Sequence, residues 1–143
     1  MLLNIAIAAF LMAVTTIIHA GGMILLLHDL KQQRTGVLAW WQKSREYWIV
    51  TIILTMFIIA VLETLVWAFA YLALGAIEGL EKALYFSMVT FTTLGYGEIV
   101  LEERWRLLAS FEAANGIIMF GWTTAIVIAA VQRTYFHEKN KVS

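Results

Sequence analysis

The sequence of 143 residues contains no cysteine and no proline, and few of its side chains are charged. The absence of cysteine excludes disulfide bonds, thiolate catalysis and metal sites built on thiolates. Lysine and arginine together number 10, as do aspartate and glutamate, so the net charge is zero and a basic nucleic-acid-binding surface is not indicated. The sequence has no phosphate-binding loop of a nucleotide-binding protein. We therefore expect no enzyme, no nucleic-acid partner and no small-molecule substrate.

Apolar residues dominate the composition. Hydrophobic residues account for 62% of the chain, charged residues for 14%, and the mean hydropathy is +0.80. Soluble domains contain about 45–50% apolar and about 25% charged residues. A small soluble domain has too much surface for its volume to bury this much apolar material. The composition therefore excludes a soluble or disordered chain and predicts an all-α integral membrane protein surrounded by lipids.

Three apolar stretches are long enough to cross a bilayer. They span residues 2–27, 47–77 and 107–131, and only Glu63 and Glu112 are charged within them. A helix of about 20 residues spans the hydrocarbon core and satisfies its own backbone hydrogen bonds there. The sequence thus predicts three transmembrane helices.

Charge placement predicts how these helices are oriented. Basic residues gather in the loop at residues 31–46 and around the C-terminal tail at residues 134–143, whereas acidic residues predominate between the second and third stretches. By the positive-inside rule, the loop and the tail are cytoplasmic and the N-terminus is outside. Together with the lack of cysteine and the minimal architecture, this pattern suggests a prokaryotic inner (plasma) membrane.

A fourth, shorter apolar segment precedes a glycine-containing motif. Residues 80–92 read LEKALYFSMVTFT, which is too short to span a membrane and favours a re-entrant helix. The motif that follows at residues 93–98 reads TLGYGE. Its glycines permit positive φ, so successive backbone carbonyls can turn to one side. Stacked carbonyl oxygens can replace the hydration shell of an ion.

This segment resembles the signature of tetrameric potassium channels, which is written T-x-G-Y-G-D in that family. The run ALYFSMVTFTTLGYGEI follows the family's pattern of pore helix and filter without a gap. The resemblance covers roughly residues 47–133 and leaves the first helix outside it. It implies a homotetramer in which each chain contributes three transmembrane helices, one re-entrant pore helix and one selectivity-filter loop.

The expected organisation follows from the resemblance and the apolar pattern. It comprises an extra N-terminal transmembrane helix (1–30), a basic cytoplasmic loop (31–46), a pore domain (47–133) and a short cytoplasmic tail (134–143). Within the pore domain we expect an outer helix (47–77), a pore helix (81–92), the filter (93–98) and an inner helix (107–132).

The resemblance also assigns the residues of the filter. K⁺, the permeant ion, would bind the carbonyls of Thr93, Leu94, Gly95 and Tyr96 and the Thr93 hydroxyl, and Gly97 would complete the filter. The chain would conduct potassium passively, with no organic cofactor. One departure from the family pattern is Leu94, where valine or isoleucine is usual and where a γ-branched side chain packs differently behind the filter.

A second departure is Glu98, which replaces the usual aspartate. In the family this carboxylate often accepts a hydrogen bond from a tryptophan of the pore helix. Tyr85 occupies the matching region here, so we expect Tyr85 to donate to Glu98. Thr92, directly before the filter, is expected to support it as well.

The inner helix carries the expected gate. Gly116 falls where many members of the family have a hinge glycine. Phe120 and Val127 share a face of this helix and could form an apolar constriction that gates by dewetting. Simple packing explains these two side chains equally well.

Three polar side chains lie within the predicted spans, namely His19, Glu63 and Glu112. A carboxylate in a span is costly and usually faces the bundle interior. Each glutamate is either a proton-sensitive gate or a structural hydrogen-bonding group, with Trp105 or Thr92 as partners for Glu63 and the back of the pore helix for Glu112. His19 is interpreted as a packed, hydrogen-bonded histidine.

Three alternatives to a potassium-selective channel remain open from the sequence. One is a weakly selective cation channel, if Leu94 loosens the filter. Another is a non-conducting membrane subunit that assembles with a different pore protein. The third is an intramembrane proton or redox protein that uses His19, Glu63 and His28.

Overall fold

The computed structural model describes residues 1–32 and 45–135. These residues form four helices, which are α1 (Leu2–Gln32), α2 (Arg45–Ala73), α3 (Leu80–Phe91) and α4 (Glu103–Tyr135). Three of them contain apolar segments long enough to cross a membrane, at Leu2–Leu26, Ile49–Ala73 and Glu103–Gln132. The prediction of an all-α chain with three spans is confirmed. The centre of the predicted basic loop (33–44) and the end of the tail (136–143) lie outside the described residues.

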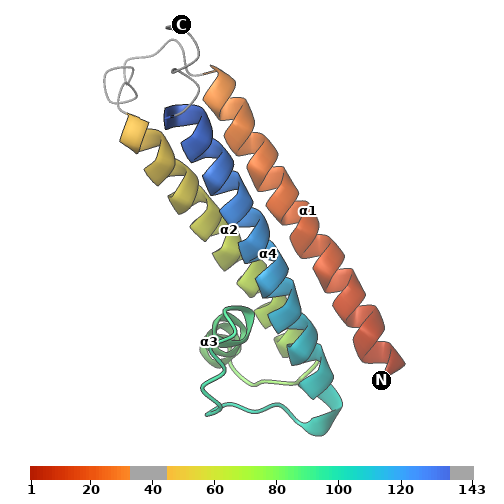
Figure 1. The fold of residues 1–143 in the computed structure, drawn as a ribbon. Coiled ribbons are helices and arrows are strands. Elements are labelled where there is room, and N and C mark those ends of the chain that lie inside the picture. Colours follow the sequence, from red (N-terminus) through yellow and green to blue (C-terminus); the bar gives the residue numbers. More distant parts are fainter. Residues whose placement is uncertain (33–44, 136–143) are drawn as a thin grey trace, which may run out of the picture.

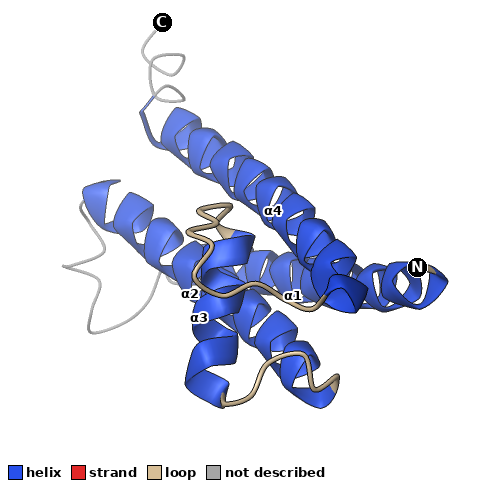
Figure 2. Ribbon diagram, turned by 90° about the horizontal axis from the view of Figure 1, so that it is seen from below, coloured by secondary structure: helices blue, strands red, loops and turns tan. Residues whose placement is uncertain are grey.

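The three long helices run side by side, and α3 packs beside one end of the bundle (Figure 1). This is the end at which the N-terminus lies. α3 contacts α2 and α4, whereas α1 contacts α2 and α4 and, among the described residues, does not touch α3. Seen from below, α3 and the loops flanking it lie against α2 and α4 (Figure 2). α1 is thus an addition to a unit formed by α2, α3 and α4.

α2 ends earlier than the outer helix predicted at 47–77, and a glycine explains the difference. Gly75 has a φ of 62°, which is the left-handed conformation that ends a helix. The N–H of Ala76 donates to the carbonyl of Tyr71 at 2.9 Å, and the N–H of Gly75 donates to that of Leu72 at 3.0 Å. These two bonds form a Schellman motif. Hydropathy alone did not predict this end of the helix, because residues beyond Ala73 are also apolar.

α4 begins earlier than the inner helix predicted at 107–132. It includes Glu103 in its first turn, where a carboxylate is favoured by the positive end of the helix dipole. The charged residues at 103–106 therefore belong to the helix, although they fall outside the apolar run. α3, at Leu80–Phe91, lies close to the pore helix predicted at 81–92.

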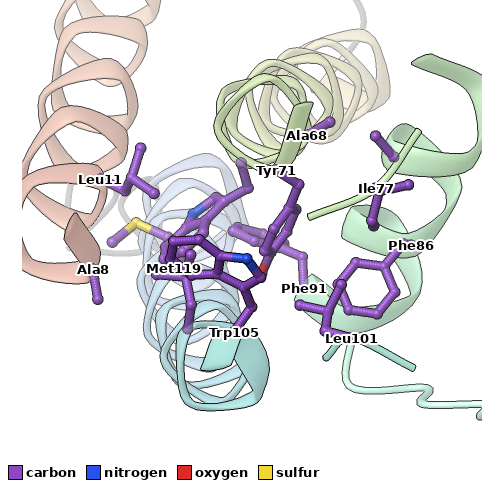
Figure 3. Packing of buried hydrophobic residues seen from close by; sticks show 13 residues of the cluster. Ala8, Leu11, Ala68, Tyr71, Ile77, Phe86, Phe91, Leu101, Trp105 and Met119 are labelled. Atoms are coloured by element: carbon purple, nitrogen blue, oxygen red, sulfur yellow. The ribbon is translucent and has the colours of Figure 1, made fainter. Parts of the chain in front are cut away.

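The main apolar core lies at the end of the bundle that carries α3, and all four helices contribute residues to it. Trp67, Tyr71 and Phe91 are fully buried in it. Leu101, which precedes α4, and Trp105, in the first turn of α4, complete it (Figure 3). The core thus fixes α3 against α2 and α4. The loop that follows α3 emerges on the same side.

A second, smaller cluster holds the other half of the bundle together. It consists of Leu26 from α1 with Ile52, Met56 and Ile59 from α2. A Cβ atom on Gly22 would lie 2.3 Å from the side chain of Ile59, so this glycine lets α1 and α2 approach closely. Small residues at such contacts are the usual means of packing helices in lipid.

Candidate ion-conduction site

The loop after α3 is tied to the end of that helix through its backbone amides. The N–H of Thr93 donates to the carbonyl of Thr90 at 2.9 Å. The N–H groups of Leu94 and Gly95 both donate to the carbonyl of Val89, at 2.9 and 3.3 Å. In a trans peptide the carbonyl points opposite to the N–H of the next residue. The carbonyls of Thr92, Thr93 and Leu94 therefore point away from α3.

The sign of φ alternates along the same segment. Thr93, Gly95 and Gly97 have φ values of 61°, 56° and 88°, whereas Leu94 and Tyr96 do not have positive φ. Alternating left-handed and ordinary residues turns every second peptide plane over relative to an extended strand. Such an alternation allows successive carbonyls to face the same side. The positive φ of Gly95 and Gly97 agrees with the sequence prediction.

Thr93 is the part of this geometry that the sequence did not predict. A β-branched residue at positive φ is an outlier and costs on the order of 1–3 kcal/mol. Nothing in the residue type signals it. The bond from its own N–H to Thr90 and the bond from Leu94 to Val89 hold the strained residue in place.

The side chains of this segment are open in a single chain. Leu94 is 57% and Tyr96 is 68% exposed. Behind the segment lies a recess of about 90 Å³ lined by residues of α3 and of the loop, namely Tyr85, Phe86, Val89, Thr90, Gly95, Gly97, Glu98 and Ile99. The segment therefore has room on the α3 side, and the described residues leave its Leu94 and Tyr96 side chains exposed.

The structure brings Tyr85 and Glu98 together, as the sequence analysis expected. A hydrogen bond with the Glu98 carboxylate raises the pKa of the Tyr85 hydroxyl above its ordinary value of 10.0. This bond joins α3 to the outer end of the loop. The Thr92 hydroxyl instead donates to the Met88 carbonyl at 2.6 Å, so Thr92 caps the end of α3.

Replacing Tyr85 by phenylalanine is expected to weaken the outer end of the loop. Because the pKa of Tyr85 is raised, its proton and the bond to Glu98 are kept at neutral pH and lost as the pH rises above the ordinary tyrosine range. Currents through the variant should decay faster at neutral pH, and wild-type currents should come to match them at alkaline pH. Current decay in planar bilayers measures both effects. If currents through Tyr85→Phe and the wild type decay identically at neutral pH, the bond between Tyr85 and Glu98 does not stabilise the loop.

Glu112 lies in a buried site formed by three helices. Its Oε2 accepts a hydrogen bond from the Tyr71 hydroxyl of α2 at 2.6 Å. Its Oε1 lies 2.5 Å from the Ser87 hydroxyl of α3. That hydroxyl is also 2.8 Å from the carbonyl of Thr64 in α2. Glu112 thus contacts the back of α3, which is the structural alternative considered from the sequence.

Glu63 pairs with His19, and not with Trp105 or Thr92. The Nδ1 atom of His19 lies 3.0 Å from Oε1 of Glu63, and both side chains are buried. The His19 ring also packs against Trp122 of α4, with ring centroids 4.9 Å apart. The sequence indicated that each residue was buried. It could not pair them, because the relative rotation of α1 and α2 is set by packing.

Two contacts between α1 and α4 were not predicted from the sequence. The Asn115 side-chain amide donates to the Thr15 hydroxyl at 2.9 Å, and both residues are buried. Near the end of the bundle, the Asn4 amide donates to the Arg104 carbonyl at 2.5 Å. Asn4 and Asn115 could have indicated these contacts, because an isolated amide inside an apolar run needs a hydrogen-bond partner in lipid.

Gly116 lies at a close contact between α3 and α4. A Cβ atom at this position would be 1.9 Å from the carbonyl oxygen of Phe91, the last residue of α3. α4 is helical through this glycine. The close contact with Phe91 therefore accounts for a glycine at this position without a bend in the helix. A hinge at Gly116 stays a prediction.

The other two candidate gate residues lie in different surroundings. Phe120 is 40% exposed and packs edge-on against Phe91, with ring centroids 5.7 Å apart. Val127 packs against the second cluster, between α1 and α2. Phe120 therefore lies on the side of α4 nearest the loop, whereas Val127 faces the bundle.

Taken together, these features define an integral membrane protein in which a short helix and a carbonyl-presenting loop are held between two spans. A family profile described as "Ion channel" matches residues 51–133, from α2 through the loop to α4. This match covers more than half of the chain, so the protein belongs to this ion channel family. α1 lies outside the match. No curated protein and no solved structure matches the chain.

Proposed function

We propose that four copies of this chain form a potassium-selective channel. The observation that carries the proposal is the alternation of φ over residues 93–97 with the first N–H groups bonded to α3. This geometry presents a row of neutral carbonyl oxygens on one side. Neutral oxygens can replace the water around K⁺ and still release the ion to the next site. Because each chain has one such segment, a ring of copies around an axis is needed to surround an ion.

The rest of the site supports cation conduction. α3 ends at Phe91, and the negative end of its dipole lies directly before the loop. In the proposed re-entrant arrangement this end favours a cation in the central cavity. Glu98, Glu102 and Glu103 follow the TLGYG segment in sequence and are exposed. Such a cluster concentrates cations at a pore mouth.

The position of α1 follows from the same arrangement. α3 and its loop must face the axis, and α1 packs on α2 and α4 without contacting α3. We therefore place α1 at the periphery of the tetramer, in contact with lipid. The N-terminus and the loop share one side of the bundle (Figure 1), which fits an outside N-terminus and a cytoplasmic C-terminus in a prokaryotic inner membrane.

Purified protein in a planar bilayer tests this function directly. Under opposed potassium and sodium gradients we expect currents that reverse near the potassium equilibrium potential and are blocked by barium. A tetramer that never conducts would contradict the proposal and favour a non-conducting subunit. A monomer without current would contradict the channel assignment altogether. An absorbance spectrum of the same sample would reveal a redox cofactor.

A weakly selective cation channel is the second candidate, because the Leu94 side chain is largely exposed within one chain and its packing depends on neighbouring copies. Currents that reverse near zero would support this candidate. Leu94→Val, which restores the residue usual in the family, would then move the reversal towards the potassium value. An unchanged reversal potential would show that Leu94 does not cause the weak selectivity.

A further inference from the structure

The hydrogen atoms around Glu112 can be counted, and the count decides its protonation state. Ser87 has one hydroxyl hydrogen, yet its oxygen lies 2.8 Å from the Thr64 carbonyl and 2.5 Å from Oε1 of Glu112. A carbonyl oxygen only accepts, and so does an ionised carboxylate. With Glu112 ionised, one hydrogen would serve two acceptors. One short contact between oxygen atoms would then contain no hydrogen.

A neutral Glu112 removes this conflict. Its acid hydrogen on Oε1 is donated to Ser87, Ser87 donates its own hydrogen to the Thr64 carbonyl, and Tyr71 donates to Oε2 of Glu112. Each of the three contacts then contains one hydrogen. The ion pairs found among the described residues, His19 with Glu63 and Arg104 with Glu102, do not involve Glu112. No described cation compensates a charge there.

The site sits one helical turn from the close contact of Gly116 with Phe91. Ser87 precedes Phe91 by one turn on α3, and Glu112 precedes Gly116 by one turn on α4. Ser87 meets Glu112, and the Phe91 carbonyl rests against Gly116. Two successive turns of α3 are therefore matched to two successive turns of α4. The carbonyl-presenting loop begins directly after the second of them.

We propose that Glu112 is a positioning residue, held as a neutral acid, whose hydrogen bonds to Ser87 and Tyr71 fix the filter-bearing end of α3 against α4. The consequence for conduction rests on the proposed channel function. The groups facing Glu112 are Tyr71 from α2 and Ser87 from α3, and the titratable group of α1, His19, is engaged with Glu63. Removal of the acid proton at alkaline pH leaves Ser87 with one hydrogen for two acceptors, so its bond to Glu112 or its bond to the Thr64 carbonyl is lost and the filter loosens.

Infrared spectroscopy of the full-length protein in liposomes tests the protonation state without reference to conduction. A protonated carboxylic acid gives a carbonyl band separate from that of a carboxylate. At neutral pH the wild type should show such a band that Glu112→Gln lacks. If Glu112→Gln does not assemble, Ser87→Ala serves instead, because loss of the acceptor shifts the band of a neutral Glu112. An unchanged acid band in the variant examined would overturn the proposal.

Potassium and sodium flux then tests positioning. Glutamine keeps a donor for Ser87 and an acceptor for Tyr71. Glu112→Gln should therefore keep wild-type selectivity at neutral pH, and its selectivity should no longer decline at alkaline pH. Ser87→Ala should lower the potassium-to-sodium permeability ratio by about tenfold, because it orphans buried groups. Ser110→Ala, at an exposed serine of α4, is the matched control. A Glu112→Gln channel that is as unselective as Ser87→Ala would contradict a neutral acid. Absence of flux from the wild type would refute the channel function and leave the infrared result standing.

Discussion

Replacing Gly116 by alanine is expected to abolish the proposed potassium flux and to lower the thermal stability of the protein. The added Cβ would lie 1.9 Å from the Phe91 carbonyl oxygen and 2.8 Å from its carbon. Both are backbone atoms, which no side-chain rotation can move aside. Overpacking of this kind typically costs about 1–3 kcal/mol, and more when the backbone must shift. Either α3 or α4 has to move, and the loop begins one residue after Phe91.

Gly121 provides a matched control on the same helix. A Cβ atom there would meet nothing within 4 Å, so Gly121→Ala should leave stability within about 1 kcal/mol of the wild type, since alanine favours a helix over glycine. Thermal unfolding of the detergent-solubilised protein, together with liposome flux, separates the two variants. If Gly116→Ala conducts normally, α3 and α4 do not pack as described. If both variants fail alike, helix flexibility and not close packing is what the glycines supply.

Replacing His19 by leucine is expected to cause the largest loss of stability among substitutions in α1. Glu63 would remain fully buried without its partner, and its second oxygen, Oε2, already has no hydrogen bond. Removing one member of a buried hydrogen-bonded pair leaves the other without a partner, which costs about 1–3 kcal/mol and more for a charged group. We expect little folded protein from this variant, measured as the yield and thermal stability of the detergent-solubilised protein.

The double variant His19→Leu with Glu63→Leu identifies the cause. Replacing both members of a buried pair by apolar residues of similar volume is often neutral or stabilising, so the double variant should recover folding. Thr16→Val is the control for substitution in α1, since the Thr16 hydroxyl is exposed and bonds only within its helix. A double variant as unstable as the single one would show that packing against Trp122, and not the pair, is essential. A stable His19→Leu variant would show that the pair contributes little.

The fold was largely predictable because apolar length is a strong signal in a membrane protein. Three spans and a short helix before the TLGYGE motif follow from runs of residue type alone. The ends were less predictable. Gly75 ends α2 inside an apolar stretch, and Glu103 begins α4 inside a charged one. Both ends depend on backbone geometry and the helix dipole, which hydropathy does not contain.

The candidate site was predictable where residue type dictates conformation. Gly95 and Gly97 have the positive φ that their type permits, and Tyr85 reaches Glu98. Thr93 has the same backbone conformation against its own preference, and only the bonds to α3 reveal why. The pairing of His19 with Glu63 is set by how α1 turns against α2, which a single sequence does not encode locally.

The few polar contacts of α1 have a consequence for how this chain can change over evolutionary time. Lipid attracts an apolar helix face about as well as another helix does, so apolar burial alone gives α1 little preference for one rotation or depth. Asn4, Thr15 and His19 supply that preference, through hydrogen bonds to α4 and the pairing with Glu63. The many exposed apolar positions of α1 are then free to drift among leucine, isoleucine and phenylalanine. Substitutions at the three polar positions would instead be accepted only together with changes in their partners.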